Sequence, residues 1–387
     1  VIEGSPQLAS RHSFQGLPIS IPTISVHTIG AGGGSIAWID DGDHLQVGPQ
    51  SAGATPGPAC YNRGGIDPTF TDAALVLGYI DPSNYLGGSI SLDSNLSAQA
   101  LGAVADSLGM SVQEAAAGIV RITIAKIAGA VRVISIEQGL DPRDFSLLVY
   151  GGAGALVGAT VARELEIPTM VIPIAPATFS ALGMLTIDVV HDYSQTYITS
   201  LDQIEHDVLD GIYRGLMDRG SKALTRDGVD KAAWKFLPTA EMRYQGQEHT
   251  VNIPMPTDLL QDYDTENIRK MFGDVHLKQY GHKMDDPVEI VTLRLRSVGV
   301  LPRPEIPSLD VNESHTARER DANRLVYRSP EEGNIAYKIY KRNHLALDKL
   351  VTGPAIIEES SSTTILHAGD QAVVGVYGEL VISPSST

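Results

Sequence analysis

The sequence predicts an α/β part over residues 1–195, followed by a β-rich α+β part over residues 196–387. Three observations support this division. A short apolar run at residues 145–150 precedes a glycine turn, a helical segment and a second apolar run, which is typical of a strand–turn–helix–strand unit. Two longer helical patterns come before that unit. Beyond about residue 192, apolar and polar residues alternate as they do in half-buried strands.

The elements follow in chain order. A strand-like run at residues 21–29 leads into a glycine-rich turn at 30–35, a short strand at 36–39 and an acidic turn at 40–43. A long loop of glycine, proline and alanine covers residues 51–65. Helices are expected over residues 96–108 and 111–135, and Ser111 with Glu114 forms a capping box at the start of the second. Buried strands at 145–150 and 169–174 flank a helix at 155–165. The second part is expected to hold a helix near 207–224 and strands at 249–253, 288–296 and within 335–383.

Composition excludes several classes of protein. The chain has 387 residues, enough for two domains with separate cores. Its 29 basic and 46 acidic residues leave a net charge of -17, which disfavours binding to a phosphate backbone. No stretch approaches the roughly 20 apolar residues that cross a bilayer, and the single cysteine excludes an internal disulfide. We therefore expect a cytoplasmic protein that binds neither nucleic acid nor membrane.

Because the chain opens at Val1 without a methionine, we also expect it to be processed or part of a longer polypeptide.

Two glycine-rich turns are the main candidates for ligand contacts. Residues 30–35 expose backbone N–H groups without side chains in the way, which suits phosphate oxygens. They match neither a P-loop nor a dinucleotide fingerprint, because no Gly-Lys-Ser/Thr follows and a strand comes next. Residues 151–154 lie between a strand and a helix, where nucleotides often bind. A tight hairpin and close strand–helix packing are the alternatives, but two such turns together favour a nucleotide cleft.

His27 and Asp72 are polar candidates beside these turns. His27 precedes the first turn, where it could bind a metal or orient a phosphate; a structural histidine at a strand end is the alternative. Asp72 opens a helical run, so a helix N-cap is the alternative to a catalytic role.

Other polar residues are better explained without a ligand. The acidic turn at residues 40–43 lacks the downstream glutamate of a calcium loop, so a solvated turn is expected. Cys60 has no base nearby in the sequence and is expected to be a buried small residue rather than a nucleophile. Glu358 and Glu359 are expected at the surface end of a strand.

Longer motifs carry a resemblance to a known family. Residues 27–37, His-Thr-Ile-Gly-Ala-Gly-Gly-Gly-Ser-Ile-Ala, resemble the second phosphate loop of the hydantoinase A/5-oxoprolinase family, and residues 47–61 resemble its long glycine/proline loop. Further matching segments follow in the family's order over nearly the whole chain: residues 68–73, 86–88, 135–145, 151–154, 180–183 and 243–247, His276 with Tyr280 and Gly281, and residues 353–357.

The resemblance implies an actin/sugar-kinase/Hsp70-like ATPase lobe within a heteromeric enzyme. Such an enzyme uses ATP and a divalent metal, Mg or Mn, to open a lactam or imide ring or to carboxylate a ketone. The resemblance assigns phosphate contacts to Gly32, Gly33, Gly34 and Ser35, and contacts to the nucleoside side to Gly151, Gly152 and Gly154. It makes His27 and Asp72 the catalytic candidates, with His27 also the candidate metal ligand.

Three departures from the family pattern shape the functional expectation. Ser25 stands where the family usually has aspartate, and Val157 where it has histidine. The family's Asp-x-Gly-Gly-Thr phosphate loop is absent from these residues, so half of the ATP cleft is expected on another chain or segment. The sequence therefore predicts a subunit or fragment of an ATP-dependent cyclic amidohydrolase that works with a hydantoinase B-type subunit. An acetone- or acetophenone-carboxylase subunit is the first alternative. A non-catalytic structural subunit, which Ser25 and Val157 favour, is the second.

Overall fold

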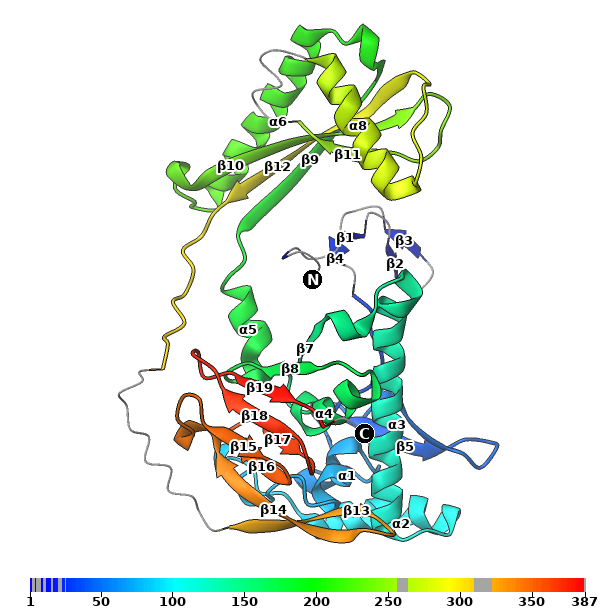
Figure 1. The fold of residues 1–387 in the computed structure, drawn as a ribbon, viewed down its shortest axis with the longest axis vertical. Coiled ribbons are helices and arrows are strands. Elements are labelled where there is room, and N and C mark those ends of the chain that lie inside the picture. Colours follow the sequence, from blue (N-terminus) through cyan, green and yellow to red (C-terminus); the bar gives the residue numbers. More distant parts are fainter. Residues whose placement is uncertain are drawn as a thin grey trace. The chain divides into compact units, whose positions relative to one another are not determined.

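A computed structural model describes residues 1, 4, 8–9, 12–14, 17–19, 23–24, 26–255, 264–309 and 322–385 (Figure 1). The chain divides into two compact units: unit 1 is formed by Val1–Ala181 with Ile306–Thr387, and unit 2 by Leu182–Glu305. Residue 195, where the sequence predicts a division, lies inside strand β9 (Val189–Ser200). Unit 1 contains the C-terminal segment because β19 (Leu380–Ser383) pairs antiparallel with β8 (Thr169–Ile172).

Unit 1 begins with short paired strands. β1 (Leu8–Ala9) pairs with β4 (Thr23–Ile24), and β2 (His12–Phe14) pairs with β3 (Leu17–Ile19). The predicted strand over residues 21–29 is therefore found only at Thr23–Ile24; residues 26–29 have no regular structure, and 21–22 and 25 lie outside the described residues. β5 (Ser35–Ile39) and β6 (Leu45–Ser51) then form a hairpin around the predicted acidic turn.

Three helices of unit 1 form as their apolar periodicity dictates. They are α1 (Phe70–Val76), α2 (Ser94–Leu108) and α3 (Val112–Ile134), so both predicted long helices are confirmed. α3 buries positions spaced three and four apart, and its predicted capping box between Ser111 and Glu114 is present. These buried faces belong to one core that also includes the strands of the C-terminal segment.

The predicted strand–turn–helix–strand unit is present as β7 (Ser146–Leu148), α4 (Gly154–Glu164) and β8. β7 and β8 are parallel neighbours in a five-stranded sheet of order β15-β18-β19-β8-β7. β7 is the edge strand of that sheet, so the expectation of a buried strand is wrong: Leu148 is 49% exposed and Tyr150 50% exposed. β8 buries Met170 and Ile172 instead.

The remaining elements of unit 1 come mostly from the C-terminal segment. β13 (Asn323–Ser329), β14 (Gly333–Lys341), β16 (Ala355–Glu358) and β17 (Thr363–Leu366) form a four-stranded sheet in that order. β15 (Leu350–Thr352) and β18 (Gln371–Val374) complete the five-stranded sheet. Short helical turns lie at Ala59–Tyr61, Tyr85–Gly88, Ile136–Gln138, Pro142–Asp144, Pro176–Thr178 and Arg342–His344. Helix α5 (Phe179–Met184) contains the boundary between the two units, after Ala181.

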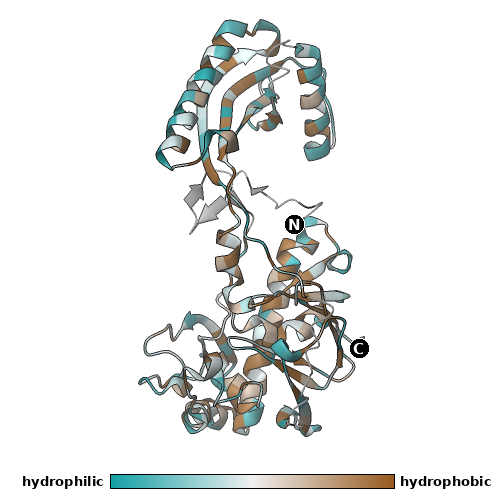
Figure 2. Cartoon of the chain, turned by 90° about the vertical axis from the view of Figure 1, so that its left-hand side faces the viewer, coloured by the Kyte–Doolittle hydropathy of each residue, from teal (hydrophilic) through white to brown (hydrophobic). Residues whose placement is uncertain are grey.

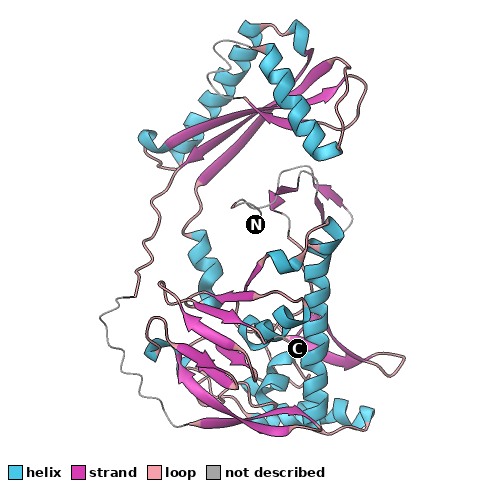
Figure 3. Cartoon of the chain, viewed as in Figure 1, coloured by secondary structure: helices cyan, strands magenta, loops and turns pink. Residues whose placement is uncertain are grey.

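Unit 2 is a two-layer α+β unit. Its antiparallel sheet has the order β11 (Val251–Pro254), β10 (Trp234–Tyr244), β12 (Val288–Gly299), β9, and it packs against α6 (His206–Arg226) and α8 (Thr265–Tyr280) (Figure 3). Short turns at Leu201–Gln203 and Lys231–Ala233 connect these elements. Both helices turn an apolar face to the sheet, and their other faces are hydrophilic (Figure 2). The predicted helix near 207–224 is confirmed as α6, whereas α8 was not expected.

The sheet of unit 2 shows why alternating residues predicted strands. Every second residue of β10 from Pro238 to Tyr244 is buried beneath the helices. The opposite face carries cross-strand ion pairs, including Arg243 with Glu289 and Arg294 with Glu241. Among the described residues of either unit, no helix has the length and apolar character needed to span a bilayer.

Candidate functional site

The first glycine turn, residues 30–35, is a rigid hairpin entry held by its own serine. The Oγ atom of Ser35 accepts a hydrogen bond from the N–H of Gly32 at 2.9 Å and donates one to the carbonyl of Gly30 at 3.3 Å. Gly30 packs so tightly on β6 that an added Cβ would lie 2.5 Å from Pro49. Gly32, in contrast, faces open space, with no atom within 4 Å of its added Cβ. The turn is therefore anchored at its base and free at Gly32.

The second glycine turn, residues 151–154, lies next to the first. A Cβ added to Gly33 would lie 3.9 Å from the Cβ of Ala153, so the two turns meet although they are far apart in sequence. Gly151 has a left-handed backbone (φ +92°) and its N–H binds the carbonyl of Pro176. α4 begins at Gly154 without any side-chain cap. Its first N–H groups and positive dipole end are thus available to an anion.

Gly154 and Gly158 also serve packing. Their added Cβ atoms would lie 3.1 Å from Val149 and 2.7 Å from the sulfur of Met170, respectively. Close strand–helix contact, the alternative weighed for the second turn, is therefore present at Gly154. It does not exclude an anion, because the side of the turn formed by Gly151 and Gly152 has no atom within 4 Å of either added Cβ.

Asp72 is completely buried behind the first turn. Its carboxylate accepts five hydrogen bonds, from the N–H groups of Ala59, Cys60 and Thr69 and from the hydroxyls of Thr69 and Ser97. With Thr69 it forms the capping box of α1, as the N-cap alternative expected. The next residue back, Thr71, binds the carbonyl of Gly33 through both its N–H and its hydroxyl. Asp72 therefore acts on the glycine turn from behind, by positioning α1.

His27 lies exposed ahead of the first turn. Among the described residues, no group of three or more His, Cys, Asp or Glu side chains is placed to hold a metal ion. The residues of this chain that the structure describes thus do not fit a resident metal, and the predicted metal role rests on His27 alone. Ser25, the first departure from the family pattern, lies outside the described residues.

The other polar expectations can be checked directly. Asp40 accepts hydrogen bonds from the N–H groups of Gly42 and His44, and the backbone bond from His44 is the main reason that its pKa falls to about 2. It closes the β5–β6 turn, so the expected solvated turn is confirmed. Cys60 is fully buried, and desolvation raises the pKa of its thiol. That confirms the buried small residue, because the thiolate needed for nucleophilic attack is disfavoured.

The expectation for Glu358 is wrong: it is 3% exposed and not at the surface. Arg324 binds one of its carboxylate oxygens at 2.6 Å and Lys341 binds the other at 2.5 Å. Its neighbour Glu359 binds Arg342 at 2.6 Å, and desolvation raises the pKa of its carboxyl despite that cation. Each cation lies 17 to 34 residues in sequence from the glutamate that it binds and belongs to a different element, so no local pattern could have revealed the pairs.

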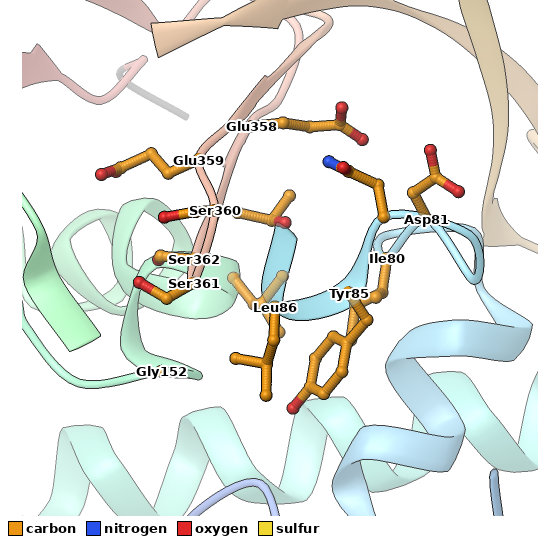
Figure 4. A pocket seen from close by; sticks show the side chains of 13 residues that line it. Ile80, Asp81, Tyr85, Leu86, Gly152, Glu358, Glu359, Ser360, Ser361 and Ser362 are labelled. Atoms are coloured by element: carbon orange, nitrogen blue, oxygen red, sulfur yellow. The ribbon is translucent and has the colours of Figure 1, made fainter. Parts of the chain in front are cut away.

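Both glutamates line a small pocket beside the second glycine turn. The walls are the tip of the β16–β17 hairpin, the Tyr85–Gly88 turn, and Gly152 with Leu156 at the start of α4 (Figure 4). Sequence reasoning found Gly152 but missed the hairpin tip. The only local signal was the run of hydroxyl side chains at residues 360–364.

An apolar hollow lies on the other side of α4. It is lined by β7 and α4 and has a volume of about 210 Å³. Val157, the second departure from the family pattern, is 4% exposed there. A histidine at this position would place an imidazole among apolar neighbours such as Leu147 and Val161.

Comparison with known protein families identifies both parts of the chain. Residues 1–193 match the Hydantoinase/oxoprolinase family, and residues 200–378 match the Hydantoinase/oxoprolinase C-terminal domain. An uncharacterized protein of Methanocaldococcus jannaschii is 36% identical over 95% of this chain and 52% of its own length. Caprolactamase subunit alpha of Pseudomonas jessenii is 32% identical over 95% and 53%, and acetone carboxylase beta subunit of Xanthobacter autotrophicus is 26% identical over 95% and 53%. The chain spans about half the length of these relatives.

Solved structures show the same mixed α/β fold. The ATP-dependent caprolactamase from Pseudomonas jessenii superimposes with a TM-score of 0.76 at 32% identity, covering 97% of this chain and 55% of that one. A nucleotide-free acetone carboxylase superimposes with a TM-score of 0.86 at 23% identity, covering 99% and 56%. Both likenesses extend over nearly all of this chain.

Proposed function

Because the chain belongs to the hydantoinase/oxoprolinase family, we propose that it supplies one half of the ATP cleft of an ATP-dependent cyclic amidohydrolase. The observation that carries this proposal is the meeting of the two glycine turns at Gly33 and Ala153. Together they offer backbone N–H groups and an uncapped helix N-terminus on one surface, which is the chemistry that phosphate oxygens need. An actin-like ATPase lobe is the architecture we infer for this half.

Each residue has a role in that proposal. The N–H groups of Gly33 and Gly34 hold phosphate oxygens, while those of Gly32 and Ser35 are bonded within the turn and fix its shape. Gly151, Gly152 and Gly154 contact the nucleoside side. Asp72 is a positioning residue, because it touches only donors within the protein. His27, exposed ahead of the turn, orients a phosphate. We route no step through a protein-held metal; a divalent ion would enter with the triphosphate.

The chemistry follows from the weakness of amides as electrophiles. ATP, when bound, supplies a phosphoryl group. Transfer of that group to a lactam or imide oxygen releases ADP and makes the ring carbon a better electrophile. Water adds at that carbon, the ring C–N bond breaks, and hydrolysis of the resulting acyl phosphate releases phosphate. The chain's own residues contribute positioning and charge stabilisation around the phosphates. A hydantoinase B-type subunit would help to bind the organic ring, and a second chain or segment would carry the missing phosphate loop.

The open edge of β7 favours such a second lobe. Among the strands that the structure describes, β7 pairs only with β8, and the side chains of Leu148 and Tyr150 beside it are exposed. A free edge with apolar side chains is a surface on which further chain can pair.

A carboxylase subunit is the second candidate, because this chain is similar to acetone carboxylase both in sequence and in fold. ATP consumption by the native assembly should be measured with a panel of lactams, imides and ketones, with and without bicarbonate. Ring opening requires no bicarbonate, whereas carboxylation does. Consumption that appears only with a ketone and bicarbonate would replace the amidohydrolase by the carboxylase.

The non-catalytic alternative is tested by Gly32→Asp. The open space at Gly32 accepts the side chain, while the added carboxylate repels phosphate. We expect unchanged thermal stability and loss of ATP binding. Gly102→Asp, on α2 and equally open, is the control and should bind ATP normally. An unaltered protein that binds no ATP in its native assembly would favour the structural subunit.

A further inference from the structure

The pocket between the β16–β17 hairpin tip and the second glycine turn has features that packing alone does not explain. Ser362 lines it, is 6% exposed, and its Oγ atom has no hydrogen-bond partner. Buried hydroxyls are nearly always hydrogen-bonded, and among the described residues only Ser297, Ser362 and Thr364 have such an orphaned oxygen. Ser362 is the one that lines this pocket.

The charges around the pocket select the kind of ligand. Three carboxylates line it, those of Asp81, Glu358 and Glu359, and each is paired with a cation. Arg324 contacts both Asp81 and Glu358, Lys341 binds Glu358, and Arg342 binds Glu359. These pairs leave little uncompensated charge of either sign, so neither a phosphate nor a metal ion is favoured. In Figure 4 the two glutamate side chains point in opposite directions from the hairpin tip. What remains is an uncharged group that both donates and accepts hydrogen bonds.

The size of the pocket and the residues that line it further limit the kind of ligand group that it can hold. The pocket's volume is about 30 Å³, which is room for one or two hydroxyl groups and not for a ring. Tyr85 and Leu86 form its apolar side, against which the face of a sugar can pack (Figure 4). Gly152, assigned above to the nucleoside side of the ligand, forms part of the wall. A ligand bound at the second glycine turn would therefore have its neighbouring chemical group in this pocket.

We propose that this pocket is the subsite for the ribose hydroxyls of the nucleotide, with Ser362 as the hydrogen-bonding residue. The inference rests on the proposed function, since it requires a nucleotide on the second glycine turn. It adds a binding residue more than 200 positions away in sequence. The hairpin tip that carries Ser362 is held by a backbone hydrogen bond of 2.9 Å from the Glu359 N–H to the Ser362 carbonyl and by the ion pairs of Glu358 and Glu359.

The test compares two hydroxyl deletions in the same hairpin. Ser362→Ala removes the buried, unpartnered hydroxyl of a residue that lines the pocket. Thr364→Val removes an equally orphaned oxygen that does not line it. Because neither hydroxyl has a partner, both variants should keep or raise the thermal stability. Equilibrium binding of ATP, 2′-deoxy-ATP, 3′-deoxy-ATP and ITP to the native assembly is then measured for the unaltered protein and for both variants.

We expect at least one deoxynucleotide to bind roughly 2–10-fold more weakly than ATP to the unaltered protein. In Ser362→Ala, ATP should weaken by a similar factor and the preference for ATP over that deoxynucleotide should disappear. Thr364→Val should behave like the unaltered protein. Equal binding of ATP and both deoxynucleotides would overturn the subsite while leaving the proposed function intact. Weaker binding of ITP, with both deoxynucleotides binding as tightly as ATP, would show that the amino group of the base occupies the pocket. That result would also overturn the ribose subsite. No binding of ATP at all would instead overturn the proposed function.

Discussion

The hydroxyl of Thr71 donates a hydrogen bond of 2.8 Å to the carbonyl of Gly33, across 38 residues of sequence. The Thr71 N–H binds the same carbonyl at 2.9 Å. Thr71 precedes Asp72, whose buried carboxylate fixes the start of α1. The position of the first glycine turn is thus set by a helix whose own position depends on a fully hydrogen-bonded aspartate. This relationship makes the turn a pre-organised element, and it can be weakened one bond at a time.

Thr71→Val removes the side-chain bond and leaves the backbone bond in place. We expect the free energy of unfolding to fall by about 1 kcal/mol. ATP affinity, measured by calorimetry, should fall several-fold because the turn loses one restraint. Thr123→Val is the matched control, since the Thr123 hydroxyl is also buried but binds Ile119 within α3. Equal loss of affinity in the two variants would show that the effect is not specific to the turn.

Gly48→Ala should disrupt the base of the first glycine turn. The added Cβ would lie 2.2 Å from the carbonyl oxygen of Gly30, and Gly48 has a left-handed backbone with φ +62°. Each effect is unfavourable, so we expect a loss of at least ~2 kcal/mol in the free energy of unfolding. Gly102→Ala in α2 has free space and a helical backbone, and should gain ~0.5–1 kcal/mol. Urea unfolding distinguishes the two; a tolerated Gly48→Ala contradicts the packing described.

Stability should decline with acid because of His367. The ring is buried, and desolvation first and then Arg328 lower its pKa from 6.5 to about 3. Between these pH values His367 is protonated in the unfolded chain and neutral in the folded protein. Its contribution to the free energy of unfolding is therefore complete above pH 6.5 and is lost as the pH falls toward 3. The slope is about 1.4 kcal/mol per pH unit, or about 2 kcal/mol between pH 6.5 and 5.

The measurement is urea unfolding of the unaltered protein and His367→Gln across this pH range. In the variant, the free energy of unfolding should depend less steeply on pH, and the difference in slope should correspond to one proton. This holds whatever the absolute stability of the variant. His44→Gln, at a side chain that is 77% exposed, should keep the original slope. Identical slopes in all three proteins would refute the assignment.

The free edge of β7 should be covered in the native assembly. Leu148→Glu places a charge on that edge, and we expect it to reduce the amount of partner polypeptide that purifies with the chain, seen by native mass spectrometry. Leu237→Glu on β10 is the control, because Leu148 and Leu237 are each 49% exposed. The partner should carry the Asp-x-Gly-Gly-Thr loop. A partner retained equally by both variants would place its contact elsewhere.

Local patterns were sufficient for several helices and for the two glycine turns. Helices α2, α3 and α6 follow from apolar residues three and four apart, and the capping box at Ser111 follows from spacing alone. The two glycine turns, the buried Cys60 and the solvated acidic turn were also foreseen. Each of these depends on neighbours within a few residues, which is the range over which a single sequence is informative.

Tertiary structure alone decided which distant segments meet. The last 80 or so residues pack into unit 1 because β19 pairs with β8, and no local signal encodes that pairing. β7 is an edge strand and not a buried one, because burial depends on what lies beside a strand and not on its composition. From the sequence Glu358 is expected at the surface, but in the structure it is buried because Arg324 and Lys341 neutralise its carboxylate. The glycine turns themselves are thus encoded by local sequence, whereas only the fold placed Gly33 against Ala153 and Ser362 beside Gly152, because contacts between distant segments depend on the packing of the whole core.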